Sequence, residues 1–259
     1  MREGRRKHIV YYQSFDEDMV ESYNQQYSLS EDYVWVRDDL VYRFISKVLY
    51  GLARALAPVY CRCFLHMRVN NKQLLDQHAG GCCLYANHTQ PVGDALLPVW
   101  VNRRRRIDVI VSPANLGIPV IGKALPYLGA LPATGRIQDT RKLIQAIAYQ
   151  LQKGHCLVVY PEAHVWPYFT GVRPYSSVSF IYPIRENVPT YCMTTTYQKR
   201  RMGSKPRATV WLDGPFYPTE EGTLSEKAEN LRQQVHDCMT MRSQSSNYEY
   251  ICYQKGATV

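Results

Sequence analysis

The 259-residue sequence lacks the cysteine patterns that bind structural zinc or build a disulfide framework. Its eight cysteines include no C-x-x-C pair. Cys82, Cys83 and Cys156 lie within apolar runs, where a free cysteine behaves as a small hydrophobic residue. We therefore expect reduced thiols, no metal site and a cytoplasmic protein.

The sequence also lacks a run of about 18 uncharged apolar residues, so no membrane-spanning helix is expected. Its first residues, MREGRRKHIVYYQSFDED, contain no apolar core long enough for a secretory signal. The most apolar N-terminal stretch, residues 43–66, is interrupted by four cations. On a helix these cations share one sector of about 100°, opposite an apolar sector. The cations are Arg43, Lys47, Arg54 and Arg62, and the apolar residues are Ile45, Leu49, Leu52, Leu56 and Val59.

This amphipathic pattern fits two structures equally well. One is a helix that lies in an anionic membrane interface, bound peripherally to the inner face of the membrane. The other is an ordinary helix that packs its apolar face on the core. In either case Pro58 is expected to bend or divide the helix.

No linker, internal repeat or low-complexity segment divides the chain, which favours a single domain. We expect an N-terminal extension at 1–40, an α/β domain at 41–245 and a C-terminal tail at 246–259. The formal net charge of +9 suits anionic partners such as lipid, nucleic acid or a phosphorylated substrate, although a solvated basic face has the same composition. The densest basic clusters are Arg2, Arg5, Arg6 and Lys7, and the run Arg103 to Arg106.

After residue 66, apolar strand-like runs alternate with helical periodicity. This order predicts an α/β fold with a mixed, largely parallel sheet flanked by helices, preceded by the amphipathic segment. Strands are expected at 81–87, 106–113, 155–163, 188–198 and 208–218. Helices are expected at 94–102, 139–154 and 225–242, the last with Ser225 as its N-cap.

The stretch LYANHTQPVGDALLPVW, residues 84–100, reads as strand, turn and helix. On a continuous helix His88 and Asp94 would lie roughly 240° apart, but Pro91 and Gly93 favour a turn that folds Asp94 back onto His88. A histidine held by a carboxylate is a common general base. Because no G-x-S-x-G occurs and no serine lies near His88, the base would act directly on a substrate hydroxyl.

Two other interpretations of this turn stay open. Asp94 could be a helix N-cap, with His88 a loop residue bonded to backbone. Alternatively, His88 and Asp94 could join Glu162 and His164 as metal ligands, although their spacing matches no metal motif.

Four ordered stretches resemble the conserved blocks of the glycerol-phosphate and lysophosphatidic acid acyltransferase family. They are NHTQPVGD, IPVIGKALPYLGALPATGR, VVYPEAHVWP and NVPTYCMTTTY, within about residues 80–215. The resemblance implies transfer of a fatty acyl group from acyl-CoA or acyl carrier protein to a lysophospholipid hydroxyl. His88 would be the base and Asp94 its orienting group, with no covalent acyl-enzyme and no cofactor.

The resemblance also implies a set of substrate-binding residues. These are Asn87 in the first block, Arg136 at the end of the second, and Pro161, Glu162 and His164 in the third. The chain departs from the family in three ways: five residues rather than four separate His88 from Asp94, Arg136 falls one position later than expected after Gly129, and the third block lacks its usual arginine. Either Arg173 or Lys123 would replace that arginine, or the acceptor would not carry the usual phosphate.

Two other functions remain possible from the sequence. A lipid-binding homologue without turnover is compatible with the missing arginine. A nucleic-acid-binding protein is compatible with the charge and the 21 tyrosines, but the run Arg103 to Arg106 has no interleaved aromatic residues and no nucleic-acid motif is present. We therefore expect an anionic membrane surface as a partner and no nucleic acid.

Overall fold

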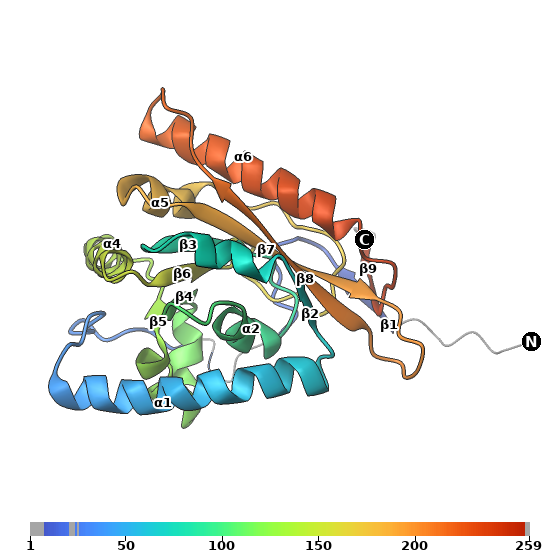
Figure 1. Cartoon of the computed structure of the whole chain (residues 1–259), viewed down its shortest axis with the longest axis horizontal. Coiled ribbons are helices and arrows are strands. Elements are labelled where there is room, and N and C mark those ends of the chain that lie inside the picture. The colour runs from blue at the N-terminus through green and yellow to red at the C-terminus, as the bar shows by residue number, and fades with distance from the viewer. Residues whose placement is uncertain (1–7, 21–23, 25, 257–259) are drawn as a thin grey trace, which may run out of the picture.

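The computed structural model describes residues 8–20, 24 and 26–256, arranged as a central sheet between two layers of helices (Figure 1). The strands are β1 His8–Tyr12, β2 Arg68–Asn70, β3 Cys82–Ala86, β4 Ile107–Val111, β5 Ala130–Pro132, β6 Cys156–Val159, β7 Thr190–Gln198, β8 Arg207–Phe216 and β9 Ile251–Lys255. The α-helices are α1 Leu40–Val59, α2 Gly93–Val101, α3 Ile121–Ala124, α4 Ile137–Gln152, α5 Ile181–Arg185 and α6 Leu224–Ser243. Shorter turns of other helix types are η1 Tyr60–Phe64, η2 Lys72–Gln77, η3 Pro113–Gly117, η4 Pro126–Leu128 and η5 Val178–Phe180.

Seven strands form the main sheet in the order β2-β8-β7-β3-β6-β4-β5. The strands from β7 to β5 run parallel, β8 is antiparallel to β7, and β2 is parallel to β8. The predicted fold class, a mixed and largely parallel sheet flanked by helices, is confirmed. Because the parallel strands share one direction, the loops that follow β3 and β6 meet at the same edge of the sheet.

The two faces of the sheet carry separate apolar cores. In β3, Leu84 faces the core covered by α1 and α2, and Tyr85 faces the core covered by α4, α5 and α6. Figure 1 shows α1 and α2 on one side of the sheet and α5 and α6 on the other. This burial on both faces explains why the parallel strands read as continuous apolar runs and not as alternating ones.

The strands and helices expected along the chain are present, with bounds that differ by a few residues. The predicted N-cap Ser225 is wrong, because the N-cap of α6 lies two residues earlier. Its N-cap is Thr223, whose hydroxyl accepts from Glu226 N at 3.3 Å, while Glu226 Oε2 accepts from Thr223 N at 2.7 Å. Two backbone N–H groups are thus satisfied reciprocally, which a cap at Ser225 would not achieve.

The amphipathic segment forms α1 and continues into the π-helical turn η1 without a break at Pro58. The face of α1 that packs on the protein carries Ser46, Tyr50 and Ala57, and these are buried. The opposite face exposes a continuous apolar stripe. This stripe consists of Val41, Phe44, Val48, Leu52, Leu56 and Val59.

The position of this stripe differs from that of an ordinary core-packing helix, whose apolar face is the buried one. Of the residues expected on the apolar face, Leu52, Leu56 and Val59 are exposed, and Ile45 and Leu49 are half-buried. Among the described residues, no helix combines the length and the hydrophobicity needed to cross a membrane.

The extension and the tail, for which the sequence suggested no structure, meet as the parallel pair β1 and β9. The small sheet packs on the buried ring of Trp166, which lies 4.8 Å from the ring of Tyr12 and 4.9 Å from that of Tyr253. The first basic cluster, Arg2, Arg5, Arg6 and Lys7, lies outside the described residues. In the second cluster, Arg105 is buried and donates to two backbone carbonyls, so this cluster is not a uniformly solvated patch.

Candidate active site at the carboxyl edge of the sheet

The turn after β3 brings His88 and Asp94 together, as the sequence predicts. Nδ1 of His88 lies 2.8 Å from Oδ2 of Asp94, and the same oxygen accepts from Gln90 N at 2.9 Å. Asp94 is therefore not the N-cap of α2. That position is Val92, whose side chain makes no capping bond.

Gly93 permits this turn because it has no side chain. A Cβ at this position would lie 2.8 Å from Leu65 Cδ1 and 2.9 Å from Gln90 Cβ, closer than real contacts allow. Gly93 is not among the glycines with positive φ. The turn therefore uses the close approach that glycine allows and not its unusual dihedral angles.

The His88 ring is oriented on a second side by Tyr160, at the end of β6. The two rings stack with centroids 4.3 Å apart, and Tyr160 Oη donates to Asp94 O at 2.6 Å. Burial, followed by the charge of Asp94, raises the pKa of Tyr160 well above its ordinary value, so this hydroxyl stays protonated and remains a donor. Tyr160 was not predicted from the sequence, although an aromatic residue directly before Pro161 was the available signal.

The His88 ring is partly exposed, and one of its two nitrogens remains available for proton transfer. The His88 side chain is 18% exposed and that of Asp94 is 3% exposed. Because Asp94 occupies Nδ1, Nε2 is the ring atom left to bind a proton of another molecule. The arrangement can hold one tautomer and stabilise the imidazolium that forms when Nε2 takes up a proton.

The Glu162 carboxylate binds the backbone of the turn at His88. Its Oε2 accepts from His88 N at 3.3 Å and from Arg173 Nη2 at 3.1 Å, and its Oε1 accepts from Arg173 N at 3.1 Å. Both side chains of the ion pair are buried. Burial raises the pKa of Glu162, and the Arg173 charge opposes that rise. The pair therefore connects two loops under the histidine.

The guanidinium of Arg173 has further partners in the N-terminal segment and the third block. It donates to the carbonyls of Phe15 and His164. The His164 ring pairs with Asp18, with Nδ1 2.5 Å from Oδ1. Residues before α1 thus cover the side of the loop that carries Glu162 and Arg173.

Asn87 joins the same turn to the neighbouring strand β7. Its side-chain amide donates to Thr195 O at 3.0 Å and accepts from Thr195 N at 2.8 Å, at the point where β3 ends. Gln90 Nε2 donates to Tyr197 Oη at 2.8 Å, which fixes the far side of the turn. Tyr197 and Gln90 were not singled out from the sequence.

The structure thus brings together Asn87, His88, Asp94, Glu162, Arg173 and His164, with Pro161 adjacent to Glu162. Arg136 and Lys123 form no hydrogen bond or ion pair with this group in the described part of the chain. Arg136 pairs with Asp139 at 2.7 Å and donates to the carbonyls of Leu29 and Ser30. Lys123 is exposed on α3.

A metal site built from this group is not favoured by the contacts. Glu162 is paired with Arg173, His164 with Asp18 and His88 with Asp94. In the described part of the chain, no three ligand atoms of His88, Asp94, Glu162 and His164 lie close enough together to share a metal ion.

Of two cavities in the described part of the chain, the smaller lies beside the His88 turn. The small one, of about 180 Å³, is lined by Gln90, Tyr197 and Lys205 together with aromatic and apolar residues, among them Tyr60 and Phe64 of η1. A larger one of about 520 Å³ lies at the opposite, amino edge of the sheet, among Arg106, Asp108 and His155. The larger cavity is therefore separate from the His88 turn.

The fold has a solved counterpart. The chain is similar to the crystal structure of the 1-acyl-sn-glycerophosphate (LPA) acyltransferase PlsC from Thermotoga maritima, with a TM-score of 0.56 and 12% sequence identity over 82% of this chain and 86% of the other. No protein-family model and no curated protein matches the sequence. The likeness is therefore one of fold: an α/β protein with the architecture of an acyltransferase.

Proposed function

We propose that this protein transfers a fatty acyl group from an acyl thioester, acyl-CoA or acyl carrier protein, to a hydroxyl of a lysophospholipid. The observation that carries the proposal is the bond of 2.8 Å between a partly exposed His88 and a buried Asp94, in a fold shared with an acyltransferase. The four sequence blocks that resemble the acyltransferase family support the same activity.

The chemistry follows from the free nitrogen of His88. Nε2 accepts the proton of the acceptor hydroxyl while the hydroxyl oxygen attacks the thioester carbonyl. The C–S bond then breaks, and the thiolate leaves and takes up the proton from the imidazolium. Asp94 stabilises the imidazolium during this cycle and holds Nδ1 protonated.

The apolar stripe of α1 supports delivery of the substrate from a membrane. Its large side chains are exposed, from Phe44 at 70% to Val48 at 47%, and the cations of the same helix lie in the opposite sector. Such a helix lies in an interface with its apolar face in the lipid and its cations at anionic head groups. We propose that α1 binds the protein to an anionic membrane surface and places the His88 turn beside its lipid substrate.

The activity is tested by thiol release. Purified protein with an acyl-CoA and lysophosphatidate is expected to release free thiol, and His88→Ala is expected to lower kcat by about 10²–10⁴. His78→Ala is the matched control, because His78 lies outside the turn. Equal rates in His88→Ala and the parent, with folding intact, would refute the assignment of His88 as the base.

Membrane binding is tested by flotation with vesicles that contain phosphatidylglycerol. Leu52→Gln with Leu56→Gln is expected to abolish flotation without a change in the melting temperature, since both leucines are exposed. Val178→Gln is the control, because Val178 is an exposed apolar residue in η5, outside α1. Unchanged flotation of the double variant would contradict the membrane role of α1.

A second candidate function is lipid binding without turnover. The two arginines expected to bind the acceptor phosphate are both paired with carboxylates, Arg173 with Glu162 and Arg136 with Asp139. This pairing favours lipid binding without turnover, because it leaves neither guanidinium free for the acceptor phosphate. Under this alternative, the parent protein would bind lysophosphatidate vesicles but release no thiol with any acyl thioester.

A further inference from the structure

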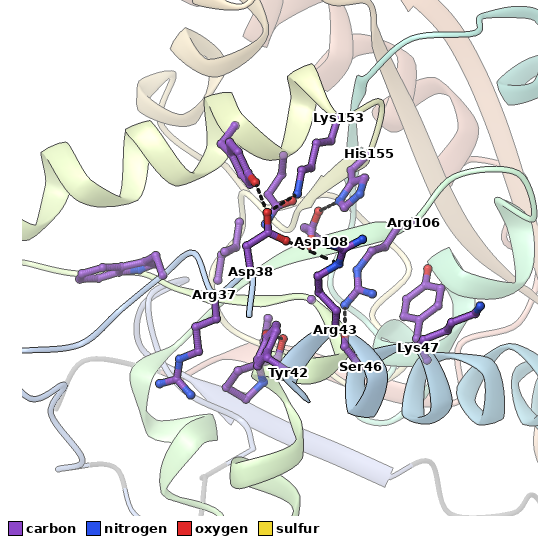
Figure 2. Close-up of a pocket in the computed structure, with 18 of the residues that line it drawn as sticks. Arg37, Asp38, Tyr42, Arg43, Ser46, Lys47, Arg106, Asp108, Lys153 and His155 are labelled. Carbon is purple, nitrogen blue, oxygen red and sulfur yellow. Dashed lines mark hydrogen bonds and ion pairs between the residues drawn. The ribbon is translucent and has the colours of Figure 1, made fainter. Parts of the chain in front are cut away.

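The larger cavity lies where the parallel strands begin, at the edge of the sheet opposite the His88 turn. Its volume is about 520 Å³, and its walls come from the loop before α1, from α1 itself, from the starts of β4 and β5, and from the end of α4. Figure 2 shows α1 along one side and the end of α4 on the other. None of the predicted substrate-binding residues lines this cavity.

The lining is strongly basic. Six arginine and lysine side chains and one histidine line the cavity, against two carboxylates, Asp38 and Asp108; with the histidine neutral, the excess is four positive charges. The six are Arg37, Arg43, Lys47, Arg54, Arg106 and Lys153. In the described part of the chain, Lys47 and Arg54 have no carboxylate partner. An excess of this size in one concave site favours an anionic ligand.

One of these donors, Arg106, is held in place before any ligand binds. Arg106 Nη2 donates to Ser46 Oγ and to Tyr127 O, both at 2.7 Å, and its guanidinium lies 4.8 Å from the ring centre of Tyr50. Ser46 is buried within α1, so this contact is fixed on both sides. A fixed guanidinium loses little conformational entropy when it binds an anion.

A second histidine–aspartate pair belongs to the same cavity. His155 Nδ1 lies 2.7 Å from Oδ2 of Asp108, which is buried. Since Asp108 occupies Nδ1, Nε2 is the nitrogen that remains for a ligand in the cavity. Figure 2 shows His155, Arg106 and Arg43 gathered around the two carboxylates, with Arg37 and Lys47 farther out on either side.

We propose that this cavity is a binding site for a phosphomonoester, separate from the acyl-transfer turn. A phosphomonoester carries up to two negative charges and three acceptor oxygens, which suits a fixed guanidinium, a histidine and flexible lysines around one cavity. The source is either a soluble phosphate compound or the head group of an anionic phospholipid. Arg43 and Lys47 belong to α1 but lie on its cavity side, largely opposite the exposed apolar stripe, so the test has a separate experiment for each source.

The proposal is tested by calorimetric titration with inorganic phosphate at fixed ionic strength. The pocket variant is Arg43→Gln with Lys153→Gln, since both cations are solvent-exposed and one lies on α1 and the other just after α4. It is expected to bind phosphate at least about tenfold more weakly than the parent. The charge-matched control, Arg141→Gln with Arg201→Gln, removes two exposed cations outside the cavity and is expected to bind as the parent does.

A separate vesicle-binding experiment tests whether the ligand is a lipid head group. Vesicles of phosphatidylcholine with phosphatidate, a phosphomonoester, are compared with vesicles that carry phosphatidylglycerol, a phosphodiester, at equal surface charge. Preference for phosphatidate that is lost in the pocket variant and kept in His88→Ala assigns the head group to this cavity and not to the acyl-transfer site. Phosphate binding without that preference assigns a soluble ligand.

One further variant guards against loss of folding. His155→Gln changes only the strand side of the cavity and is expected to weaken phosphate binding about tenfold with an unchanged far-ultraviolet spectrum. If parent, pocket variant and control bind phosphate and phosphatidate equally, or if none binds either, the cavity is not a phosphomonoester site. Acyl transfer is measured separately, so that result leaves the assignment of His88 untouched.

Discussion

The molecule holds two histidine–aspartate pairs at opposite edges of one sheet. Nδ1 lies 2.8 Å from the carboxylate in the pair of His88 and Asp94, and 2.7 Å in the pair of His155 and Asp108. The imidazole side chains are 18% and 19% exposed, and both aspartates are 3% exposed. Distance and burial alone do not distinguish them.

The surroundings of the two histidine–aspartate pairs distinguish them. The His88 ring stacks on a tyrosine, and Glu162 bonds to its backbone in a loop at the carboxyl ends of parallel strands. The His155 ring faces a basic cavity at the amino ends of the same strands. A general base needs room for a neutral hydroxyl beside Nε2, whereas an excess of cations favours an anion that stays bound. We therefore assign proton transfer to the first pair and ligand binding to the second.

The largest expected effect concerns the ion pair that supports only the first histidine. Arg173→Met leaves the Glu162 carboxylate buried without its partner, so the free energy of unfolding is expected to fall by about 3–5 kcal/mol. Urea denaturation followed by circular dichroism measures this change at neutral pH. In the double variant Glu162→Gln/Arg173→Met no charge remains buried, and much of the lost stability should return.

The pH dependence of Arg173→Met sharpens this test. Burial already raises the pKa of Glu162, and removal of the opposing arginine raises it further above the unfolded value. A carboxyl group with a raised pKa in the folded state is most compatible with folding at low pH, and its contribution is lost as the pH rises through that pKa. The deficit of the variant should therefore shrink on acidification; a deficit that grows there would contradict the buried pair.

Asp94→Asn separates positioning from binding at the first pair. Asparagine keeps an acceptor for the N–H of Gln90 but cannot stabilise an imidazolium, so kcat should fall at least about a hundredfold with little change in KM. Steady-state thiol release measures both constants. Asp237→Asn, exposed on α6, is the control.

Recovery by a longer carboxylate completes that experiment. Asp94→Glu restores the charge at a displaced position and should regain part of kcat. A rise in KM with unchanged kcat for Asp94→Asn would instead mean that Asp94 only shapes the binding site.

The first pair could be predicted from the sequence because its chemistry is local. His88 and Asp94 are six positions apart, and Pro91 and Gly93 mark the turn between them. The apolar runs likewise predicted strands β3, β4, β6, β7 and β8 and the two long helices after residue 66, but not β2, β5 or β9. Even so, the reason that Gly93 is required, contact with Leu65, depends on a distant segment.

The second pair could not be predicted, since His155 and Asp108 are brought together only when β6 pairs with β4. The same applies to β1 and β9, which lie at opposite ends of the chain. The sequence also did not determine which face of α1 packs on the protein. Periodicity gives an apolar stripe, but only the contacts of Ser46 and Tyr50 show that the stripe faces outward. Non-local pairing, not local propensity, decides all three.

The smallest expected effect concerns the second pair and its cavity. Asp38 is one of the two carboxylates there, and hydrogen bonds from Tyr149 and then Lys153 lower its pKa. It therefore stays negative through the neutral and mildly acidic range and repels an anionic ligand. Asp38→Asn is expected to tighten phosphate binding about threefold at low ionic strength, as removal of one charge about 7 Å away in a solvated site would do.

Calorimetry of Asp38→Asn at two salt concentrations measures this gain, which should diminish at high salt because the cavity is open to solvent. Asp76→Asn, an exposed carboxylate paired with Arg104 outside the cavity, is the control and should leave phosphate binding unchanged. Acyl transfer by Asp38→Asn should equal that of the parent only if the two histidine pairs act independently. A matching change in both activities would show that the two edges of the sheet are coupled, and the separation of roles argued from their surroundings would then fail.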